Sequence, residues 1–127
     1  MNDNKNFFAR KAFYQLPLWQ NARELRNESL KVITAFPLDE KYGLSDQIRR
    51  AARSIPACIA EGHGRFTYKD QIHFCTISRG SAMELLNHFI DAYDQNYISR
   101  ESLATLQIKI SDIIRMLNGY IGYLRKK

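Results

Sequence analysis

The sequence predicts an all-α protein, an antiparallel four-helix bundle with up-down-up-down topology. Apolar or small residues recur at alternating steps of three and four positions through most of the chain, which is the spacing of one face of a helix. Only 6 glycines and 3 prolines occur among the 127 residues, so we expect long helices joined by short links, as in a bundle. Residues 1–16 are assigned to an N-terminal arm and residues 17–127 to the bundle.

The first predicted helix runs from Leu18 to Phe36. Its column of apolar or small residues is Leu18, Ala22, Leu25, Ser29, Val32 and Phe36. Pro37 follows directly, and proline cannot continue a helix because it has no amide hydrogen and its ring crowds the preceding turn. The segment PLDEKYGLS then forms a connection, and Ser45 is expected to cap the second helix.

The second predicted helix contains a proline. Its apolar column is Ile48, Ala52, Ile55 and Ile59. Pro56 lacks the amide hydrogen that would bond to the carbonyl of Ala52, at a cost of about 3 kcal/mol, so we expect a kink at residues 52–56. The apolar pattern continues in phase beyond that point. Gly62 and Gly64 are expected to end the helix by adopting positive φ.

The third and fourth predicted helices each begin at a hydroxyl residue. Thr67, with Asp70 three residues later, matches a capping box, and Ser99 is placed to cap the fourth helix. The third helix is expected to end near Gln95 and Asn96. Its apolar column is Cys75, Ser78, Ala82, Leu85, Phe89 and Ala92. The column of the fourth helix is Leu103, Leu106, Ile110, Ile113, Leu117, Tyr120 and Leu124.

The last two helices carry more apolar residues than a bundle core requires. A core-facing helix needs about three apolar positions in seven. The third helix has a second apolar column consisting of Met83, Leu86, Ile90, Tyr93 and Tyr97. The surplus indicates either a broader core face or a second interface, and the aromatic end of the chain favours assembly into an oligomer. Aromatic residues of the N-terminal arm are expected to pack on the bundle or on a neighbour: Phe7, Phe8, Phe13 and Tyr14.

The composition is typical of a globular cytoplasmic protein. The chain is 45% hydrophobic and 25% charged. Cys58 and Cys75 lie in apolar helical context and form no disulfide framework, which favours a reducing compartment. The opening residues MNDNKNFFARK have no apolar core of a signal peptide, and no stretch approaches the ~20 apolar residues of a membrane span. We therefore expect a cytoplasmic protein with no membrane association.

The basic residues are the strongest candidates for binding. The net charge is +6, and basic proteins concentrate polyanions such as nucleic acid around themselves. Arg49, Arg50 and Arg53 lie on one side of the second predicted helix, and Arg65 and Lys69 follow at the next turn. A guanidinium group suits paired hydrogen bonds to phosphate oxygens. The alternative is a solvated face whose arginines pair with acidic residues. No sequence-reading module is present, so specific base recognition is not expected.

The stretch SIPACIAEGHGR offers little for catalysis or metal binding. Its glycines close a helix, whereas a phosphate-binding loop opens one after a strand. Glu61 and His63 are two residues apart and would point to different sides of a helix, and we expect a nearby arginine to hold Glu61. The spacing of the four candidate metal ligands matches no common zinc pattern: Cys58, His63, His73 and Cys75. We expect no enzymatic activity, no metal and no cofactor.

The segments YGLSDQIRRAARSIPACIAEGHGR and ISRGSAMELL resemble the four-helix-bundle family of 23S rRNA intervening-sequence proteins. Relatives of that family include the accessory variability proteins of diversity-generating retroelements. The family pattern runs roughly as Q-L-R-R-A-A-x-S-I-x-x-N-I-A-E-G and then I-A-x-G-S-x-x-E-L. The signature positions that match are Arg49, Arg50, Ser54, Ile55, Glu61, Gly62, Gly80, Ser81 and Glu84. Cys58 stands where the family usually has Asn, and Ser78 stands where it often has Ala.

The resemblance implies a ring-forming bundle, a homopentamer, with no established catalytic activity. The retroelement relatives bind nucleic acid and associate with a reverse transcriptase. Four small residues are expected to let the second and third helices approach closely: Ala57, Ala60, Gly80 and Ser81. Glu61 and Glu84 are expected to pair with arginines across helices or subunits, which would contribute specificity more than stability.

Two functions are consistent with these observations. The first is a non-enzymatic oligomeric bundle that binds the backbone of RNA or DNA through a basic face, as a scaffold or adaptor. The alternative is a protein-interaction module whose basic face meets an acidic partner or a reverse transcriptase and makes no contact with nucleic acid.

Overall fold

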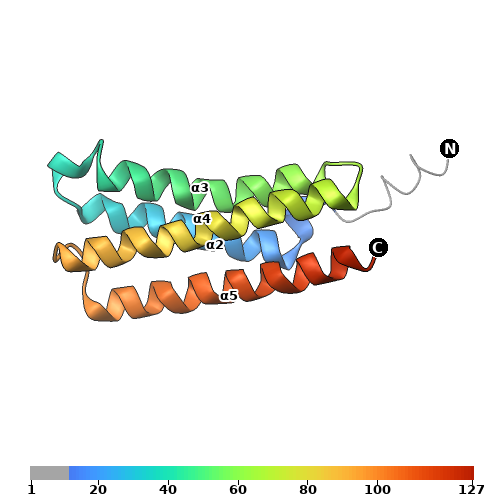
Figure 1. Ribbon diagram of the computed structural model, residues 1–127. Helices are drawn as coiled ribbons and strands as arrows, with labels where there is room; N and C mark the ends of the chain where they lie inside the picture. The colour runs from blue at the N-terminus through green and yellow to red at the C-terminus, as the bar shows by residue number, and fades with distance from the viewer. Residues whose placement is uncertain (1–11) are drawn as a thin grey trace.

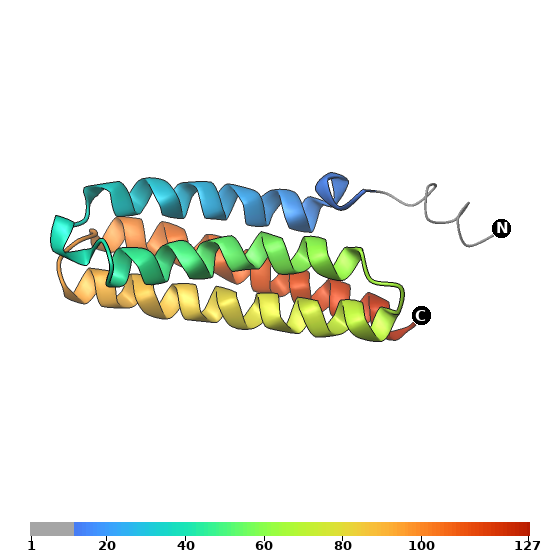
Figure 2. The ribbon, with the colours of Figure 1, turned by 90° about the horizontal axis from the view of Figure 1, so that it is seen from above.

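The structure is a computed structural model that describes residues 12–127. Four long helices pack side by side, and each runs antiparallel to the next in the chain (Figure 1). They are α2 (Pro17–Val32), α3 (Leu44–His63), α4 (Tyr68–Asp94) and α5 (Arg100–Arg125). Among neighbouring long helices, α3 and α4 share the most extensive contact, and α2 and α5 share the least extensive one. Figure 2 shows the same bundle from above, with α2 along one side of it. The all-α, up-down-up-down bundle is therefore confirmed.

The first helix ends earlier than expected. Pro17 occupies its first turn, where the missing amide hydrogen costs nothing. After α2 the chain tightens into the 3₁₀ helix η2 (Ile33–Ala35), and Phe36 is extended with ψ of 153°. The residue before a proline avoids the helical conformation because of clashes with the proline ring. Pro37 therefore keeps Phe36 out of the helical conformation, and the helical segment ends at Ala35. The link then contains the short 3₁₀ helix η3 (Leu38–Glu40).

Glu40 caps α3, in the place where Ser45 was expected to act. The helix begins at Leu44, and Ser45 is buried within its first turn. The amide nitrogen of Leu44 donates to Glu40 Oε1 at 3.1 Å. The other carboxylate oxygen accepts a hydrogen bond from the hydroxyl of Tyr97 at 2.9 Å. One side chain of the first link therefore ties the start of α3 to the link between α4 and α5.

The glycines at the end of α3 do not adopt positive φ, so that expectation is wrong. No glycine between residues 12 and 127 has a positive φ, and Gly64 caps the helix with φ of −82°. Gly62 is instead required by close packing. A Cβ atom at that position would lie 2.8 Å from the Cβ atom of Phe74 and 3.3 Å from the carbonyl oxygen of Gln71, both in α4. Upstream, α3 continues through Pro56 as one helix.

The expected caps of α4 and α5 are confirmed. Thr67 Oγ1 accepts from the amide of Asp70 at 3.1 Å, and Ser99 Oγ accepts from the amide of Ser102 at 3.1 Å. The end of α4 is a Schellman motif, in which the amide of Tyr97 bonds to the carbonyl of Ala92. Asn96 supplies the left-handed residue of that motif with φ of 66°. Asparagine tolerates this conformation better than most residues with a side chain.

The core lies along the axis of the bundle and contains the predicted columns. Every column residue is buried except Val32, Leu103 and Tyr120, which are half-buried. The second column of α4 is more exposed, because Met83, Ile90 and Tyr93 face outward. None of the helices between residues 12 and 127 combines the length and apolar character needed to cross a membrane.

The described end of the N-terminal arm packs on the bundle. Phe13 begins the 3₁₀ helix η1 (Phe13–Gln15), and its ring meets Trp19 of α2 edge-on, with 5.2 Å between the ring centroids. Tyr14 is exposed. Phe7 and Phe8 lie outside the described residues.

Candidate nucleic-acid interface

Two of the predicted arginines share one carboxylate. Asp46, in the first turn of α3, lies 3.3 Å from Arg49 Nη1 and 2.9 Å from Arg50 Nε. Two positive groups on one negative group leave this cluster of three side chains with a net positive charge. The guanidinium of Arg50 is largely exposed, and exposed ion pairs of this kind contribute only about 0–1 kcal/mol. Phosphate oxygens can therefore compete for it.

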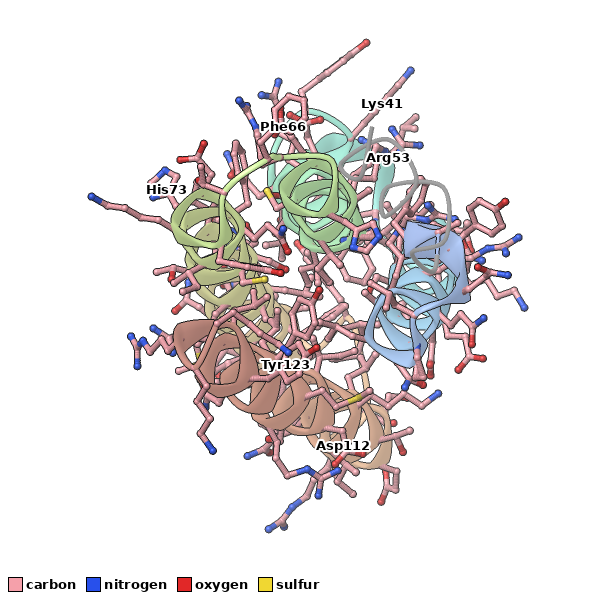
Figure 3. All side chains as sticks on the ribbon, turned by 90° about the vertical axis from the view of Figure 1, so that its right-hand side faces the viewer. Lys41, Arg53, Phe66, His73, Asp112 and Tyr123 are labelled. Atoms are coloured by element: carbon pink, nitrogen blue, oxygen red, sulfur yellow. The ribbon has the colours of Figure 1, made fainter. Side chains whose placement is uncertain are left out.

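Arg53 continues this positive surface towards α2. It is exposed, and within the described part of the chain it forms no ion pair. In Figure 3 it lies on the side of α3 that faces α2. Arg26 of α2 lines the same hollow as Arg53, and Arg23 follows one turn away on α2. We call this surface the arginine face; its residues are Arg23, Arg26, Arg49, Arg50 and Arg53.

The arginine face borders a hollow between α2 and α3. The hollow has a volume of about 610 Å³. Its apolar lining comes from both helices and from η1: Phe13, Trp19, Leu30, Pro56, Ala57 and Ala60. Trp19 is the single tryptophan of the chain. Neither Arg26 nor Trp19 was expected as a site residue, since nothing in their local spacing shows that they meet Arg53.

Arg65 and Lys69 belong to a different region. Arg65 lies beyond the end of α3, and the stretch of α3 from Arg53 to its end at His63 covers about 15 Å of helix axis. Its guanidinium is 3.6 Å from Glu61 Oε1, and it also lies over the ring of Phe74, with its Cζ 4.7 Å from the centroid. Lys69 is exposed at the start of α4. The structure therefore divides the five predicted cations into two separate groups.

Several signature residues hold α3 against α4. The hydroxyl oxygens of Ser54 and Ser81 are 2.8 Å apart across the two helices. Ile55 is fully buried, and its carbonyl accepts a hydrogen bond from Ser78 Oγ at 2.9 Å. Together with the close contact at Gly62, these interactions fix the distance between the helices. Their role in the monomer is structural.

Other signature residues do not act as expected. Gly80 lies on the outer side of α4, and no heavy atom falls within 4 Å of a Cβ placed there. The expectation that Gly80 allows close approach of α3 and α4 is therefore wrong. Ala57 and Ala60 line the hollow towards α2, so Ser81 alone among the four small residues serves that contact.

The two signature glutamates form short-range pairs. Glu61 is held by Arg65, as expected of a nearby arginine, but this partner is four residues away in the chain. Glu84 Oε1 lies 3.7 Å from His88 Nε2 on the same helix. Neither pair crosses between helices, because both follow the i to i+4 spacing of a helix surface.

The two cysteines differ in their surroundings. Cys58, at the position where Asn was expected from the resemblance, is half-buried, with its sulfur 3.5 Å from Ser54 Oγ. Cys75 is buried in α4, and burial, followed by the nearby Cys58, raises the pKa of its thiol from 9.0 to about 11. In residues 12–127, no three His, Cys, Asp or Glu side chains gather into a group that could hold a metal ion.

This difference predicts the order in which the thiols react. Raising the pKa of Cys75 from 9.0 to about 11 lowers its thiolate fraction near neutral pH roughly 100-fold. With iodoacetamide, we expect Cys58 to be alkylated at least about tenfold faster than Cys75, because the thiolate is the nucleophile. Mass spectrometry of peptides from the folded protein measures both rates, and unfolding in urea should bring them together. Equal rates in the folded protein would contradict the burial of Cys75.

The same shift predicts a pH effect on stability. The folded state holds the proton of Cys75 more tightly than the unfolded state does. Its contribution to stability is therefore fully present below pH 9 and is lost as the pH rises towards about 11.

Comparison with known proteins identifies similar sequences and folds. The profile of the 23S rRNA-intervening sequence protein family matches residues 14–119. The fold is similar to a crystal structure, at 1.70 Å resolution, of a protein of unknown function from the S23 ribosomal protein family of Bacteroides thetaiotaomicron. The two chains are 21% identical with a TM-score of 0.74, over 82% of this chain and 97% of that chain. At that identity the likeness concerns the fold alone. No curated protein matches the sequence.

Proposed function

This chain belongs to the 23S rRNA-intervening sequence protein family, and from that premise we propose that it is a non-enzymatic scaffold or adaptor that binds the backbone of RNA or DNA. The main observation that supports this proposal is the arginine face. Its residues come from α2 and α3, and among residues 12–127 the only carboxylate paired with any of them is Asp46. The rest of the face is available to an anionic partner.

The chemistry of this face suits phosphate groups. Each guanidinium presents a planar fork of N–H donors that matches two phosphate oxygens. Arginines one turn apart on α3, together with those on α2, form a strip that can follow a nucleic-acid backbone. Contacts of this type neutralise phosphates without reading bases. We propose that Arg65 and Lys69 make a second contact with the nucleic-acid backbone, at the turn between α3 and α4.

We also propose that the bundle assembles into a ring, a homopentamer. The support is the exposed apolar surface of the last two helices, where Met83 is 55% exposed, Ile90 45% and Ile108 64%. Large exposed apolar side chains in this number favour an interface. A ring would repeat the arginine face in every subunit, and repeated sites on one polymer bind more tightly than a single site.

The alternative function keeps the arginine face and changes its partner. Guanidinium groups bind carboxylates as well as phosphates, so an acidic protein, or a reverse transcriptase as in the retroelement relatives, is the second candidate partner. Binding of nucleic acid by the purified protein separates the two functions.

The test is a salt titration of binding to structured RNA and to duplex DNA. We expect affinity to fall steeply with salt and to depend little on sequence, because released counterions drive such binding. Replacing Arg50 and Arg53 with alanine should weaken binding and reduce the slope of log K against log salt by about 1–2, which is the loss of two phosphate contacts.

A matched variant controls for net charge. Replacing Arg100 and Arg115 on α5 with alanine removes the same charge as replacing Arg50 and Arg53. In each pair one arginine is held by a carboxylate, and for Arg115 this is Asp112 at 3.1 Å. This variant should retain the native slope, and light scattering should show the same assembly for all three proteins. If the native protein binds neither RNA nor DNA at low salt, the proposed function is wrong. If both variants lose the same affinity, the arginine face is not the site.

A further inference from the structure

We propose that the hollow between α2 and α3 binds one unstacked nucleotide of a single-stranded RNA or DNA. In this assignment the base lies against Trp19, while Arg26 and Arg53 hold the adjoining phosphate. The proposal rests on the proposed function, because it specifies how one part of the arginine face engages nucleic acid. It adds a site for the base, which backbone binding does not require.

The hollow has the size and lining that a base and its sugar need. Its volume of about 610 Å³ lies within the range of roughly 300–1,000 Å³ that is typical of small-molecule sites. Leu30 supplies apolar surface from α2, and Ala57 supplies it from α3. On the α3 wall of the hollow Ala57 and Ala60 have small side chains, and Trp19 lies on the α2 wall.

Two positive charges border the hollow from opposite walls. Arg26 extends from α2 and Arg53 from α3. Arg26 Nε donates to Asn27 Oδ1 at 3.1 Å, which leaves its other N–H groups for a ligand, and Arg53 pairs with no carboxylate in the described chain. Like charges that share one hollow repel each other. An anionic group between them converts that repulsion into attraction, so the charges favour a phosphate.

Trp19 supplies the surface for the base. Its ring is half-buried, with Phe13 edge-on at 5.2 Å and the Cζ atom of Arg23 at 5.7 Å from the ring centroid. Stacking of a base on an aromatic ring is stronger than an exposed cation–π contact. A base in the hollow therefore gains more from the indole than Arg23 does, and Arg23 itself does not line the hollow.

The combination of groups favours a single strand over a duplex or an acidic peptide. A duplex keeps its bases stacked inside and offers only phosphates, so it makes no use of Trp19. A carboxylate side chain engages the arginines but has no π face for the indole. A single strand offers both a base and a phosphate at neighbouring positions, as in other stacking platforms for single-stranded nucleic acid.

The experiment compares three anionic probes on the full-length protein at low salt. They are oligodeoxythymidine, an abasic oligonucleotide of the same length, and polyglutamate. Because Trp19 is the only tryptophan, its fluorescence reports the hollow directly. We expect oligodeoxythymidine to quench the fluorescence and to bind roughly tenfold more tightly than the abasic strand, which is the effect of one stacked base.

Substitutions at Trp19 distinguish the loss of base stacking from a loss of folding. By anisotropy of a labelled oligodeoxythymidine, Trp19→Ala should lose that roughly tenfold advantage, whereas Trp19→Phe should keep most of it because it retains an aromatic face. Phe66→Ala removes an exposed aromatic residue outside the hollow and should bind like the native protein. Circular dichroism melts establish that each variant is folded.

Each other outcome contradicts the proposal in a distinct way. Equal affinity for the abasic strand, with no quenching, would mean that the face binds phosphates only; the proposed function would stand and the nucleotide site would fall. If neither strand binds, both the proposed function and the nucleotide site are wrong. Tighter binding of polyglutamate than of either strand would assign the hollow to an acidic protein, and would also contradict the nucleotide site.

Discussion

Replacing Gly62 with valine is expected to lower the free energy of unfolding by about 3 kcal/mol, at the upper end of the usual cost of overpacking. A Cβ atom at this position would lie 2.8 Å from the Cβ of Phe74 and 3.3 Å from the carbonyl of Gln71. Neither atom is the end of a flexible side chain, so α3 and α4 must move apart. That movement also strains the hydrogen bond between Ser54 and Ser81. Urea denaturation at a fixed protein concentration measures the change.

Gly80→Val is the matched control for this substitution. Gly80 is also helical, but a Cβ placed there meets no atom within 4 Å. Helix propensity alone then decides the result, and the change should stay within about 0.5 kcal/mol. Equal losses at Gly62 and Gly80 would contradict the close contact of α3 with α4. A loss at Gly80 together with dissociation of the proposed oligomer would place a neighbouring subunit on that side of α4.

Replacing Phe89 with alanine is expected to cost about 3–5 kcal/mol. Phe89 is 0% exposed and is the largest fully buried side chain among residues 12–127. The loss has two parts, since the ring's transfer energy disappears and the surrounding helices cannot fully fill the space. The midpoint of urea denaturation should fall strongly, and the thermal midpoint should fall by roughly 10 °C or more.

Phe66→Ala is the control for Phe89→Ala. Its ring is 101% exposed in the turn between α3 and α4, so its removal should change stability by less than about 0.5 kcal/mol. A loss at Phe66 comparable to that at Phe89 would show that Phe66 is covered in the assembled protein. A small loss at Phe89 would contradict its place at the centre of the core.

Local periodicity was sufficient to predict the core. The columns through Ile48 and Ile55 on α3, and through Leu85 on α4, are buried as expected, because a helix face depends only on the spacing of residues within that helix. The caps at Thr67 and Ser99 were predictable for the same reason. Each involves a hydroxyl and an amide three residues apart.

Contacts between helices were not predictable in this way. Glu40 caps α3 and also binds Tyr97, which is 57 residues away in the chain. The reason for Gly62 was also misjudged, because the close approach of Phe74 depends on how far apart α3 and α4 pack. No local pattern encodes that distance.

The same distinction holds for the candidate site: the spacing of residues along one helix was predictable, and contacts between helices were not. Residue spacing and composition were enough to predict the four helices, their buried faces, the positive charge and the row of arginines on α3. The folded structure was needed to show that Arg26 and Trp19 meet Arg53 around one hollow, and that Arg65 and Lys69 lie apart from it. Residue spacing sets which face of a helix is apolar, whereas packing against the other helices sets its rotation and register, and these determine which side chains become neighbours.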